Sequence, residues 1–411
     1  MSEKLSFEAP RGMRDFYPED MAWRNRVFDA FRAAGEAAGF QPYDACVVEN
    51  YDLLARKSGE EVGDQIYHFF DKSERHIALR PEMTPTLARM VAQRQKELSF
   101  PLKWTTIAQC FRYERMTKGR KREHYQWNVD IIGEESVMAE VEVLGAAVDA
   151  LRRMGLSQSD FKVHVSSRRF LGSLLEKSGI PPERHAQVFL ALDKRGKMPD
   201  EEIAAMLRDG GLSPAEVDAA FAVMDVKSYE GCAELEELFA LARTAGFADA
   251  LVFDISVIRG LSYYTGIVFE CFDAKGEFRA IFGGGRYDNL LNAIGGESAT
   301  AVGLGFGDVV VTELLKSRLG ADAAVARKGY AVGFMFPEQR DAALAFAASL
   351  RRRGASVNLS LSAQKPKKFF SRAGQGGAEF AVFIGPDDVA AGEVRVKNLG
   401  TGEETREALA K

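Results

Sequence analysis

The segment WTTIAQCFRYERMTKGRKREHYQWNVDIIG, residues 104–133, contains two strand-like runs separated by a charged connection. The runs 104–114 and 124–133 are rich in aromatic and β-branched residues, which favour a pleated, half-buried segment. Two strands joined across a charged connection of this length are typical of an antiparallel pair. The segment therefore predicts an antiparallel sheet in the N-terminal half of the chain rather than a parallel, doubly wound one.

Polar side chains follow these two strands in a pattern that a core would not need. Gln126, Asn128 and Asp130 alternate with apolar residues, so they share one face of the second strand. Such a row lines a wet pocket rather than a core. Arg112 lies between two aromatic residues of the first strand, and a guanidinium fork matches the oxygens of a phosphate. The usual explanation for the other cations of the connection is that they lie at a solvated hairpin tip.

Three further segments carry candidate ligand-binding groups. RGLSYYTGIVFE begins with Arg259, which follows an apolar run, and arginine is almost never buried without a partner. In LRPEMTPTLARM, Glu82 and Thr84 lie where a strand gives way to a helix, so Thr84 either caps that helix or joins Glu82 in binding an ammonium group. In GGGRYDNLL, the glycines either let the backbone approach a ligand or form a flexible turn.

The composition excludes several classes of protein. The chain has 411 residues and a net charge of -5, so it allows two or three domains, and a nucleic-acid partner must bind local basic patches. The histidines form no H-E-x-x-H or H-x-x-H motif, so we expect no protein-built metal site. We find no long apolar run and no signal or transit peptide, and therefore expect a cytoplasmic protein without a membrane partner. Four widely spaced cysteines fit a reducing cytosol: Cys46, Cys110, Cys232 and Cys271.

Changes in amino-acid composition and pattern along the chain predict three regions. Residues 1–160 and 251–320 mix strands and helices and are expected to form one α+β domain. Between them, 161–250 is dominated by Leu, Ala, Glu and Lys and by proline-assisted helix starts, which predicts a helical insertion. A polar, alanine-rich linker at 316–329 leads into 327–411, where strands and helices alternate as in a small α/β domain.

Together these segments resemble the histidyl-tRNA synthetase family, which belongs to the class II aminoacyl-tRNA synthetases. FRYER…GRKREHYQWNVDIIG resembles the second motif of that class, and LRPEMTPTLARM resembles the ammonium-binding loop of the family. RGLSYYTGIVFE and GGGRYDNLL resemble its two histidine-specific signatures, which are highly specific. The resemblance covers nearly the whole chain and is weakest in the helical insertion. It implies a class II catalytic domain with an antiparallel sheet and helices, and a C-terminal anticodon-binding domain.

The resemblance also implies a reaction and its participants. Family members join histidine to ATP, which gives histidyl-adenylate and pyrophosphate, and then pass the histidyl group to the terminal ribose of tRNA(His). Mg²⁺ is expected to arrive with ATP rather than in a protein cage. The helix expected at 20–39 and the following segment with Cys46 match the dimer-forming motif, so we expect a homodimer. DNA is not an expected partner.

The expected ATP ligands lie in the second class motif and the first histidine signature. The resemblance places Arg259 and Arg112 on two sides of the α-phosphate, where fixed cations lower the cost of bringing two anions together. It places Arg120 at the γ-phosphate. Glu114 and His124 are expected to contact ATP as well.

The expected histidine ligands come from four segments. The ammonium group is expected to bind Glu82, Thr84 and Gln126, and the imidazole ring Asp130, Tyr264 and Tyr287. A carboxylate at one ring nitrogen and a phenol at the other distinguish an imidazole from other rings. Tyr263 is expected to have a packing role, because adjacent residues of a strand point to opposite faces.

Several positions depart from the usual pattern of the family. Val310 stands where the third class motif usually has an arginine over the adenine, and His124 stands where the second motif usually has an aromatic residue facing it. Asp130 replaces a glutamate, Ser262 an aspartate and Cys46 a proline. Because the phosphate and ammonium ligands are intact, these positions predict a different grip on adenine rather than a loss of activity.

Two other functions compete with this interpretation. The regulatory subunit of ATP phosphoribosyltransferase resembles the catalytic domain of the family and would bind histidine without making an adenylate. That relative lacks the C-terminal domain and need not keep Arg112, Arg120 and Arg259, all of which this chain has. A general tRNA-binding module would explain the basic connection but not the histidine signatures. The synthetase is therefore the favoured interpretation.

The last region predicts a tRNA-binding surface. RRRGASV and QKPKKFFSR supply lysines and arginines, which attract phosphates in a salt-dependent way. Phe369 and Phe370 either stack on unpaired RNA bases or belong to the core of this domain.

Overall fold

The computed structural model describes residues 6–55, 65–117, 119–196, 198–258, 263–320 and 329–409. The chain divides into two compact units, Met1–Gly320 and Ala321–Lys411, and each is described by itself. Among the described residues, no helix is both long enough and apolar enough to cross a bilayer.

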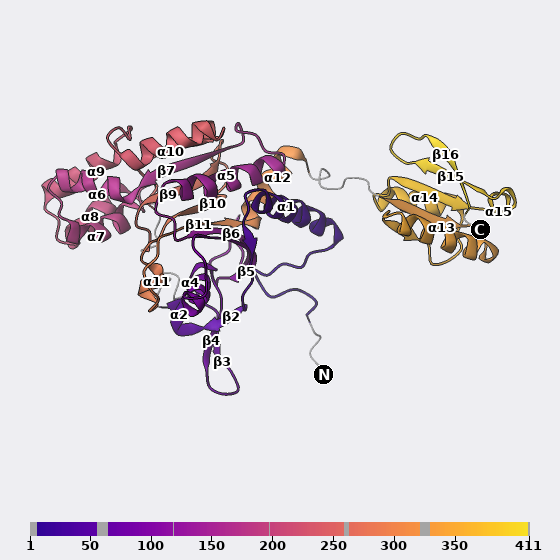
Figure 1. Ribbon diagram of the computed structural model, residues 1–411, viewed down its shortest axis with the longest axis horizontal. Helices are drawn as coiled ribbons and strands as arrows, with labels where there is room; N and C mark the ends of the chain where they lie inside the picture. Colours follow the sequence, from indigo (N-terminus) through magenta and orange to yellow (C-terminus); the bar gives the residue numbers. More distant parts are fainter. Residues whose placement is uncertain are drawn as a thin grey trace. The chain divides into compact units, whose positions relative to one another are not determined.

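An eight-stranded sheet forms the centre of the first unit (Figure 1). Its strands in spatial order are β1 (Gln41–Pro42), β5 (Leu102–Phe111), β6 (Glu123–Ile132), β11 (Ala301–Gly307), β10 (Phe282–Arg286), β9 (Ile267–Asp273), β7 (Phe161–Ser167) and β8 (Leu251–Phe253). Neighbouring strands are antiparallel except at the two edges, where β1 pairs with β5 and β7 pairs with β8 in parallel. The predicted antiparallel pair is therefore confirmed as β5 and β6, with Trp104 opposite Asp130.

The structure corrects one local expectation for this sheet and excludes one of two alternatives for another segment. Strand β5 ends at Phe111, so Arg112 follows the strand instead of lying within it. The glycines Gly283–Gly285 belong to β10 and do not form a turn. A Cβ atom on Gly284 would lie 2.2 Å from the carbonyl oxygen of Gly303 on the neighbouring strand, so the close packing of β10 requires glycine there.

Helices cover one face of the sheet, because alternate residues of its strands are large and apolar. These helices are α1 (Pro18–Ala37), α5 (Met138–Arg153) and α12 (Asp308–Leu319), and α1 contacts both α5 and α12 (Figure 1). Phe31 of α1 stacks on Trp127 of β6 with ring centroids 4.8 Å apart and contacts Phe306 of β11 edge-on at 4.7 Å. The residues that alternate with Trp127 along β6 consequently point to the opposite face.

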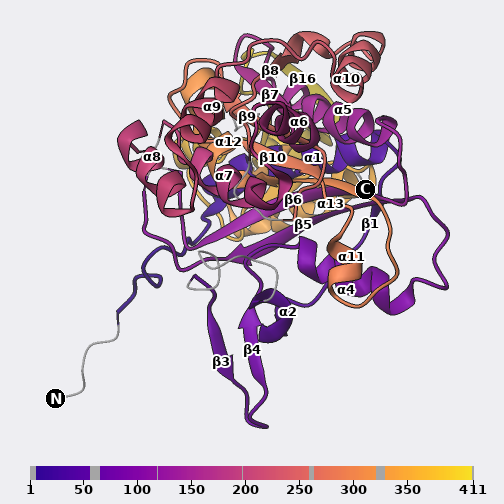
Figure 2. The same cartoon turned by 90° about the vertical axis from the view of Figure 1, so that its left-hand side faces the viewer.

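A small second sheet and short helices lie beside that opposite face. The strands are β2 (Val48–Asn50), β4 (His76–Leu79) and β3 (His68–Phe70), and the helices are α2 (Tyr51–Ala55), α4 (Thr84–Arg94) and α11 (Leu290–Ala293). The β3–β4 hairpin projects away from the main sheet in both views (Figure 2). Helix α4 begins at Thr84 itself and Met83 is its N-cap residue, which excludes capping by Thr84, one of the two alternatives for this residue.

The region between β7 and β8 is helical, as its texture predicts. It contains α6 (Arg168–Lys177), a 3₁₀ turn (Pro182–Arg184), α7 (His185–Leu192), α8 (Asp200–Asp209), α9 (Pro214–Met224), α10 (Ala233–Thr244) and a second 3₁₀ turn (Ala248–Ala250). Because β7 pairs with β9 in the main sheet, the helices begin at Arg168 and not at the expected boundary of 161. Helix α10 packs on α5, which ties these helices to the sheet.

The second unit is a five-stranded sheet with helices. Its strands in spatial order are β13 (Val357–Leu359), β12 (Tyr330–Phe334), β14 (Phe380–Ile384), β15 (Glu393–Asn398) and β16 (Glu404–Ala408), and its helices are a 3₁₀ turn (Pro337–Gln339), α13 (Arg340–Arg352), α14 (Pro366–Gln375) and α15 (Pro386–Ala391). Phe369 of α14 is buried, with its ring centroid 5.1 Å from that of Phe383. Phe369 therefore belongs to the core and is not an exposed stacking surface.

Candidate active site

A row of polar side chains runs along one face of β6. His124 Nε2 lies 3.4 Å from Gln126 Oε1, and Gln126 Nε2 donates to Asn128 Oδ1 at 3.1 Å. At the end of the row, Asp130 Oδ1 accepts a hydrogen bond of 2.6 Å from the hydroxyl group of Tyr287. The alternation in the sequence thus produces a polar row opposite the aromatic core around Trp127.

Glycines of the adjacent strand make room for this row. Gly303 and Gly305 of β11 lie opposite Asp130 and Asn128. A Cβ atom on Gly303 would lie 1.9 Å from Asp130 Oδ1, and one on Gly305 would lie 2.3 Å from Gln126 Nε2. The alternating glycines of AVGLGFG could have indicated this space from the sequence. Glycines two residues apart in a strand leave the same face of the strand without side chains.

Asp130 is buried in a manner that favours binding of a polar ligand. Burial raises the pKa of Asp130 to about 7, although the hydrogen bond from Tyr287 acts in the opposite direction. Its second oxygen, Oδ2, is buried and has no hydrogen-bond partner within the described parts of the chain. Buried carboxylate oxygens normally have partners, so an unpaired one at the end of a polar row marks a place for a ligand's N–H group.

Three tyrosines from the two histidine signatures converge beside Asp130. The ring centroids of Tyr263 and Tyr264 are 4.9 Å apart, and those of Tyr263 and Tyr287 are 6.0 Å apart. The Tyr263 hydroxyl donates to Glu82 Oε2 at 3.3 Å, so Tyr263 does more than pack. Strand β9 begins only at Ile267, so the alternation used to assign Tyr263 does not apply to it.

Glu82 and Thr84, which are expected to bind the ammonium group, lie close to Arg112, which is expected to bind phosphate. Glu82 and Thr84 are both buried, with 4% and 8% of their surfaces exposed. Arg112 Nε donates to the carbonyl oxygen of Pro81 at 2.9 Å. The guanidinium group of Arg112 is therefore anchored beside the segment that carries Glu82.

The other expected ATP ligands lie along the β5–β6 connection. Arg120 NH1 and Glu114 Oε2 form an ion pair of 2.9 Å in which the arginine is half-exposed. Burial lowers the pKa of His124 to about 3, and the charges of Arg112 and Arg14 act in the same direction. His124 is thus a neutral, flat ring at pH 7.

Two ion pairs formed by Arg14 near the third class motif were not predicted from the sequence. Arg14 forms an ion pair with Glu123 and another with Asp308 Oδ2 at 3.0 Å, and Asp308 Oδ1 accepts from the backbone N–H of Tyr125 at 2.8 Å. Val310, where an arginine is usual in the family, is buried, and its Cγ2 atom would lie 3.4 Å from a Cβ atom on Gly119. The valine therefore lies beside the tip of the β5–β6 connection as an apolar group.

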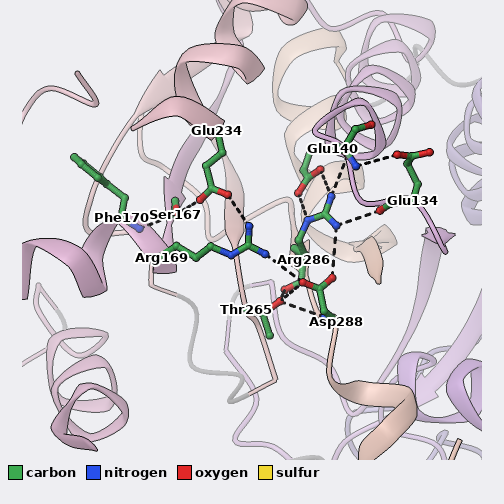
Figure 3. Close-up of polar contacts among 10 residues, drawn as sticks. Glu134, Glu140, Ser167, Arg169, Phe170, Glu234, Thr265, Arg286 and Asp288 are labelled. Atoms are coloured by element: carbon green, nitrogen blue, oxygen red, sulfur yellow. Dashed lines mark hydrogen bonds and ion pairs between the residues drawn. The ribbon is translucent and has the colours of Figure 1, made fainter. Parts of the chain in front are cut away.

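Ion pairs connect the helical region to Asp288, the residue that follows Tyr287 (Figure 3). Arg169 of α6 pairs with Glu234 of α10 at 3.0 Å and with Asp288 at 3.3 Å. Asp288 follows Tyr287 directly and also accepts from Thr265 Oγ1 at 3.0 Å. On the other side, Arg286 donates to both oxygens of Glu140, each at 2.7 Å.

Arg168, the residue before Arg169, donates hydrogen bonds to the backbone on both sides of Arg259. Arg168 Nε donates to the carbonyl oxygen of Ile258 at 3.1 Å, and its NH1 donates to that of Tyr264 at 3.3 Å. Arg259 and Ser262 fall between Ile258 and Tyr264 in the sequence and lie outside the described residues. The described residues contain no group of three or more His, Cys, Asp or Glu side chains that could hold a metal ion.

Comparisons of the sequence with known proteins identify its family. The family model described as histidyl-tRNA synthetase matches residues 12–307, and the one described as anticodon binding domain matches residues 328–411. A chloroplastic/mitochondrial histidine–tRNA ligase of Arabidopsis thaliana is 43% identical over 98% of this chain and 85% of its own length. Histidine–tRNA ligases of Leptospira biflexa and Opitutus terrae are 37% and 36% identical over 97% of this chain, and over 94% and 95% of their own lengths.

Solved structures share the fold over nearly the whole chain. A histidyl-tRNA synthetase from a Nostoc species has a TM-score of 0.82 at 23% identity and covers 98% of this chain and 97% of its own. A Bacillus halodurans protein described as an ATP phosphoribosyltransferase regulatory subunit/histidyl-tRNA synthetase has a TM-score of 0.74 at 23% identity, with 94% and 100% covered. The fold alone does not separate these two functions, whereas the family models and the curated relatives do. The chain belongs to the histidyl-tRNA synthetase family.

Proposed function

We propose that the protein activates histidine with ATP and transfers the histidyl group to tRNA(His). The observation that carries this proposal is the buried Asp130 carboxylate, with one oxygen held by Tyr287 and the other unpaired, at the end of a polar row among three tyrosines. The adenylate would be made in the first unit, which contains every residue assigned to histidine and ATP. The second unit would bind the anticodon arm.

The imidazole ring of the substrate would bind at the Asp130 end of the row. An N–H group of the ring would donate to Asp130 Oδ2, while Tyr287 and Tyr264 enclose the ring. Because the Tyr287 hydroxyl already donates to Asp130 Oδ1, its main role would be to orient the carboxylate. An amino acid without a ring N–H would leave Asp130 buried and unpaired, which is a strong basis for rejection.

The ammonium group of the substrate would bind between the row and helix α4. Glu82 supplies the negative charge, and Thr84 and Gln126 supply further oxygen acceptors. The hydrogen bond from Tyr263 to Glu82 would fix the orientation of that carboxylate. The substrate carboxylate would then lie toward Arg112, the cation anchored at Pro81.

The arginines would stabilise the negative charge that develops during adenylate formation. A carboxylate oxygen of histidine forms a bond to the α-phosphorus of ATP, and the bond to pyrophosphate breaks. Arg112 and Arg259 would hold the α-phosphate, and Arg120 would release Glu114 to reach the γ-phosphate. In the second step the terminal ribose hydroxyl of tRNA attacks the carbonyl carbon, and AMP leaves.

Because Val310 replaces the usual third-motif arginine, adenine would be bound by other groups. The neutral ring of His124 would contact the base, with Glu114 nearby. Mg²⁺ would enter bound to ATP and screen its β- and γ-oxygens, which suits an ion that keeps waters and prefers phosphates.

The assembly and location are also proposals. Helix α1 and the segment that follows it match the dimer-forming motif, and a two-fold homodimer is the commonest soluble assembly. A monomeric mass by light scattering at micromolar concentration would contradict it. The four cysteines are free, which is compatible with the cytoplasm.

ATP–pyrophosphate exchange with each of the twenty amino acids tests the proposed reaction. Only histidine should support exchange. Arg112→Gln should reduce kcat/KM by about 10²–10³-fold, because it removes a charge contact that matters most in the transition state. The exposed Arg115 is the matched control, and Arg115→Gln should leave exchange within about threefold of wild type. Histidine binding without any exchange would instead indicate a histidine-sensing protein and overturn the proposal.

A further inference from the structure

Tyr43 packs against the buried cluster that includes Tyr264 and Tyr287, and it lies outside every segment that resembles a motif for histidine or ATP. Its backbone N–H donates to the carbonyl oxygen of Thr105 at 2.9 Å, which continues the parallel pairing of β1 with β5. Its ring centroid is 5.5 Å from that of Trp104, and Trp104 is the registered partner of Asp130. Registered partners project from the same face of a sheet, so Tyr43 lies on the face that carries the polar row.

The hydroxyl group of Tyr43 is buried and has no hydrogen-bond partner among the described residues. Burial is the main reason why the pKa of Tyr43 is raised well above its usual value, and the charge of Asp130 adds to it. The phenol and the carboxylate are therefore both poorly solvated and close enough for their charges to interact. A buried hydroxyl without a partner is uncommon in proteins and needs an explanation.

Two unpaired groups with complementary hydrogen-bonding requirements thus lie beside the same buried cluster, which includes Tyr287. Asp130 Oδ2 can only accept a hydrogen bond while ionised, and a phenol can donate one. Each is buried and unpaired in the described structure. A neutral imidazole presents one N–H donor and one nitrogen lone pair on opposite sides of a small ring, so it would satisfy both groups at once.

We propose that Tyr43 is a specificity-determining residue of the histidine pocket. Its hydroxyl donates to one ring nitrogen of the substrate while Asp130 Oδ2 accepts from the other. This inference rests on the proposed function and assigns a ring contact to the segment after α1, far in sequence from both histidine signatures. Tyr287, whose hydroxyl is already used by Asp130, orients the carboxylate instead.

The test compares full-length wild type with Tyr43→Phe, which keeps the ring that packs on Trp104. In ATP–pyrophosphate exchange, the variant should raise KM for histidine about tenfold, the loss typical of one hydrogen bond, and change kcat less than about twofold. KM for ATP should not change. Tyr330 of the second unit is the matched control, and Tyr330→Phe should behave as wild type. An unchanged KM for histidine in Tyr43→Phe would overturn the proposal.

Two methylated substrates distinguish a ring contact from a structural role. The two ring N-methyl isomers of histidine each block one nitrogen, and wild type should discriminate against both. Tyr43→Phe should lose discrimination against one isomer only. Equal loss for both isomers, or for neither, would overturn the assignment.

Calorimetric binding of histidine without ATP separates this inference from the proposed reaction. Weaker binding by Tyr43→Phe alongside absent exchange in wild type would mean that the proposed reaction fails while the pocket assignment holds. Equal binding by both proteins would overturn the assignment of Tyr43.

Discussion

Asp130, the proposed ligand of the imidazole ring, lies in an environment that is unfavourable for a charge. The residue is 1% exposed and accepts one hydrogen bond, from Tyr287. Its pKa rises from 3.8 to about 7 because burial penalises the charged form. Between these two pH values the folded protein keeps a proton that the unfolded chain has released. Stability from this group is therefore present below about pH 4 and is lost as the pH rises toward 7.

Replacing Asp130 with asparagine should remove this pH dependence. An amide does not titrate, and its oxygen can still accept from Tyr287. Relative to wild type, Asp130→Asn should gain at most about 3 kcal/mol of unfolding free energy between pH 5 and pH 8, at about 1.4 kcal/mol per pH unit. Urea denaturation of both proteins at the two pH values measures the difference. If the two proteins differ in unfolding free energy by the same amount at both pH values, the pKa of Asp130 is not raised by burial.

The sequence predicted the polar row well and its surroundings less well. Alternation alone placed Gln126, Asn128 and Asp130 on one face, because a strand has a fixed period of two. Tyr263 was misassigned because it precedes β9, and no local pattern marks where a strand begins. Tyr43 was missed because its contact with Trp104 depends on the pairing of β1 with β5, which the sequence does not reveal.

At the level of elements, one buried ion pair joins helix α5 to strand β10. Glu140 and Arg286 are 1% and 3% exposed, and two hydrogen bonds of 2.7 Å connect them. Arg286 also donates to the carbonyl oxygens of Glu134 and Ser136. This pair holds the end of the strand from which Tyr287 continues into the pocket.

Glu140→Gln should destabilise the first unit strongly. The substitution removes the carboxylate that accepts both short hydrogen bonds of Arg286 and leaves that buried charge only the ion pair with Asp288 at 3.5 Å, so it should cost up to about 3–5 kcal/mol. Glu142 lies on the same helix and pairs with Lys103 at the surface, with its side chain 43% exposed, so it is the matched control. Glu142→Gln should cost less than about 1 kcal/mol in the same denaturation experiment. Equal losses for the two variants would mean that the buried pair does not stabilise the fold.

Element types were easier to predict than element boundaries. The antiparallel β5–β6 pair and the helices between β7 and β8 follow from periodicity and from helix-start signals. The glycines of β10 suggested a turn because glycine is rare in strands, and only the neighbouring backbone explains them. Helix α12 runs to Leu319, into the segment expected to be a linker, because its polar residues form the exposed side of a helix.

At the scale of the whole molecule, the chain contains two compact units whose proposed roles differ. The compact units divide between Gly320 and Ala321, and the two family models match residues 12–307 and 328–411. All assigned ligands of histidine and ATP lie in the first unit. The basic segments of α13 and α14 lie in the second, whose core includes Phe369. Activation of histidine and recognition of tRNA should therefore be separable by truncation.

Charging of tRNA(His) with labelled histidine tests the central claim most directly. The full chain should form histidyl-tRNA(His), and a chain that lacks residues 327–411 should keep ATP–pyrophosphate exchange but lose nearly all charging, because phosphate attraction from the second unit is gone. Circular dichroism and light scattering of the truncated chain should confirm that it is folded and keeps its oligomeric state. Failure of the full chain to charge tRNA(His), or equal charging by the folded truncated chain, would contradict the account.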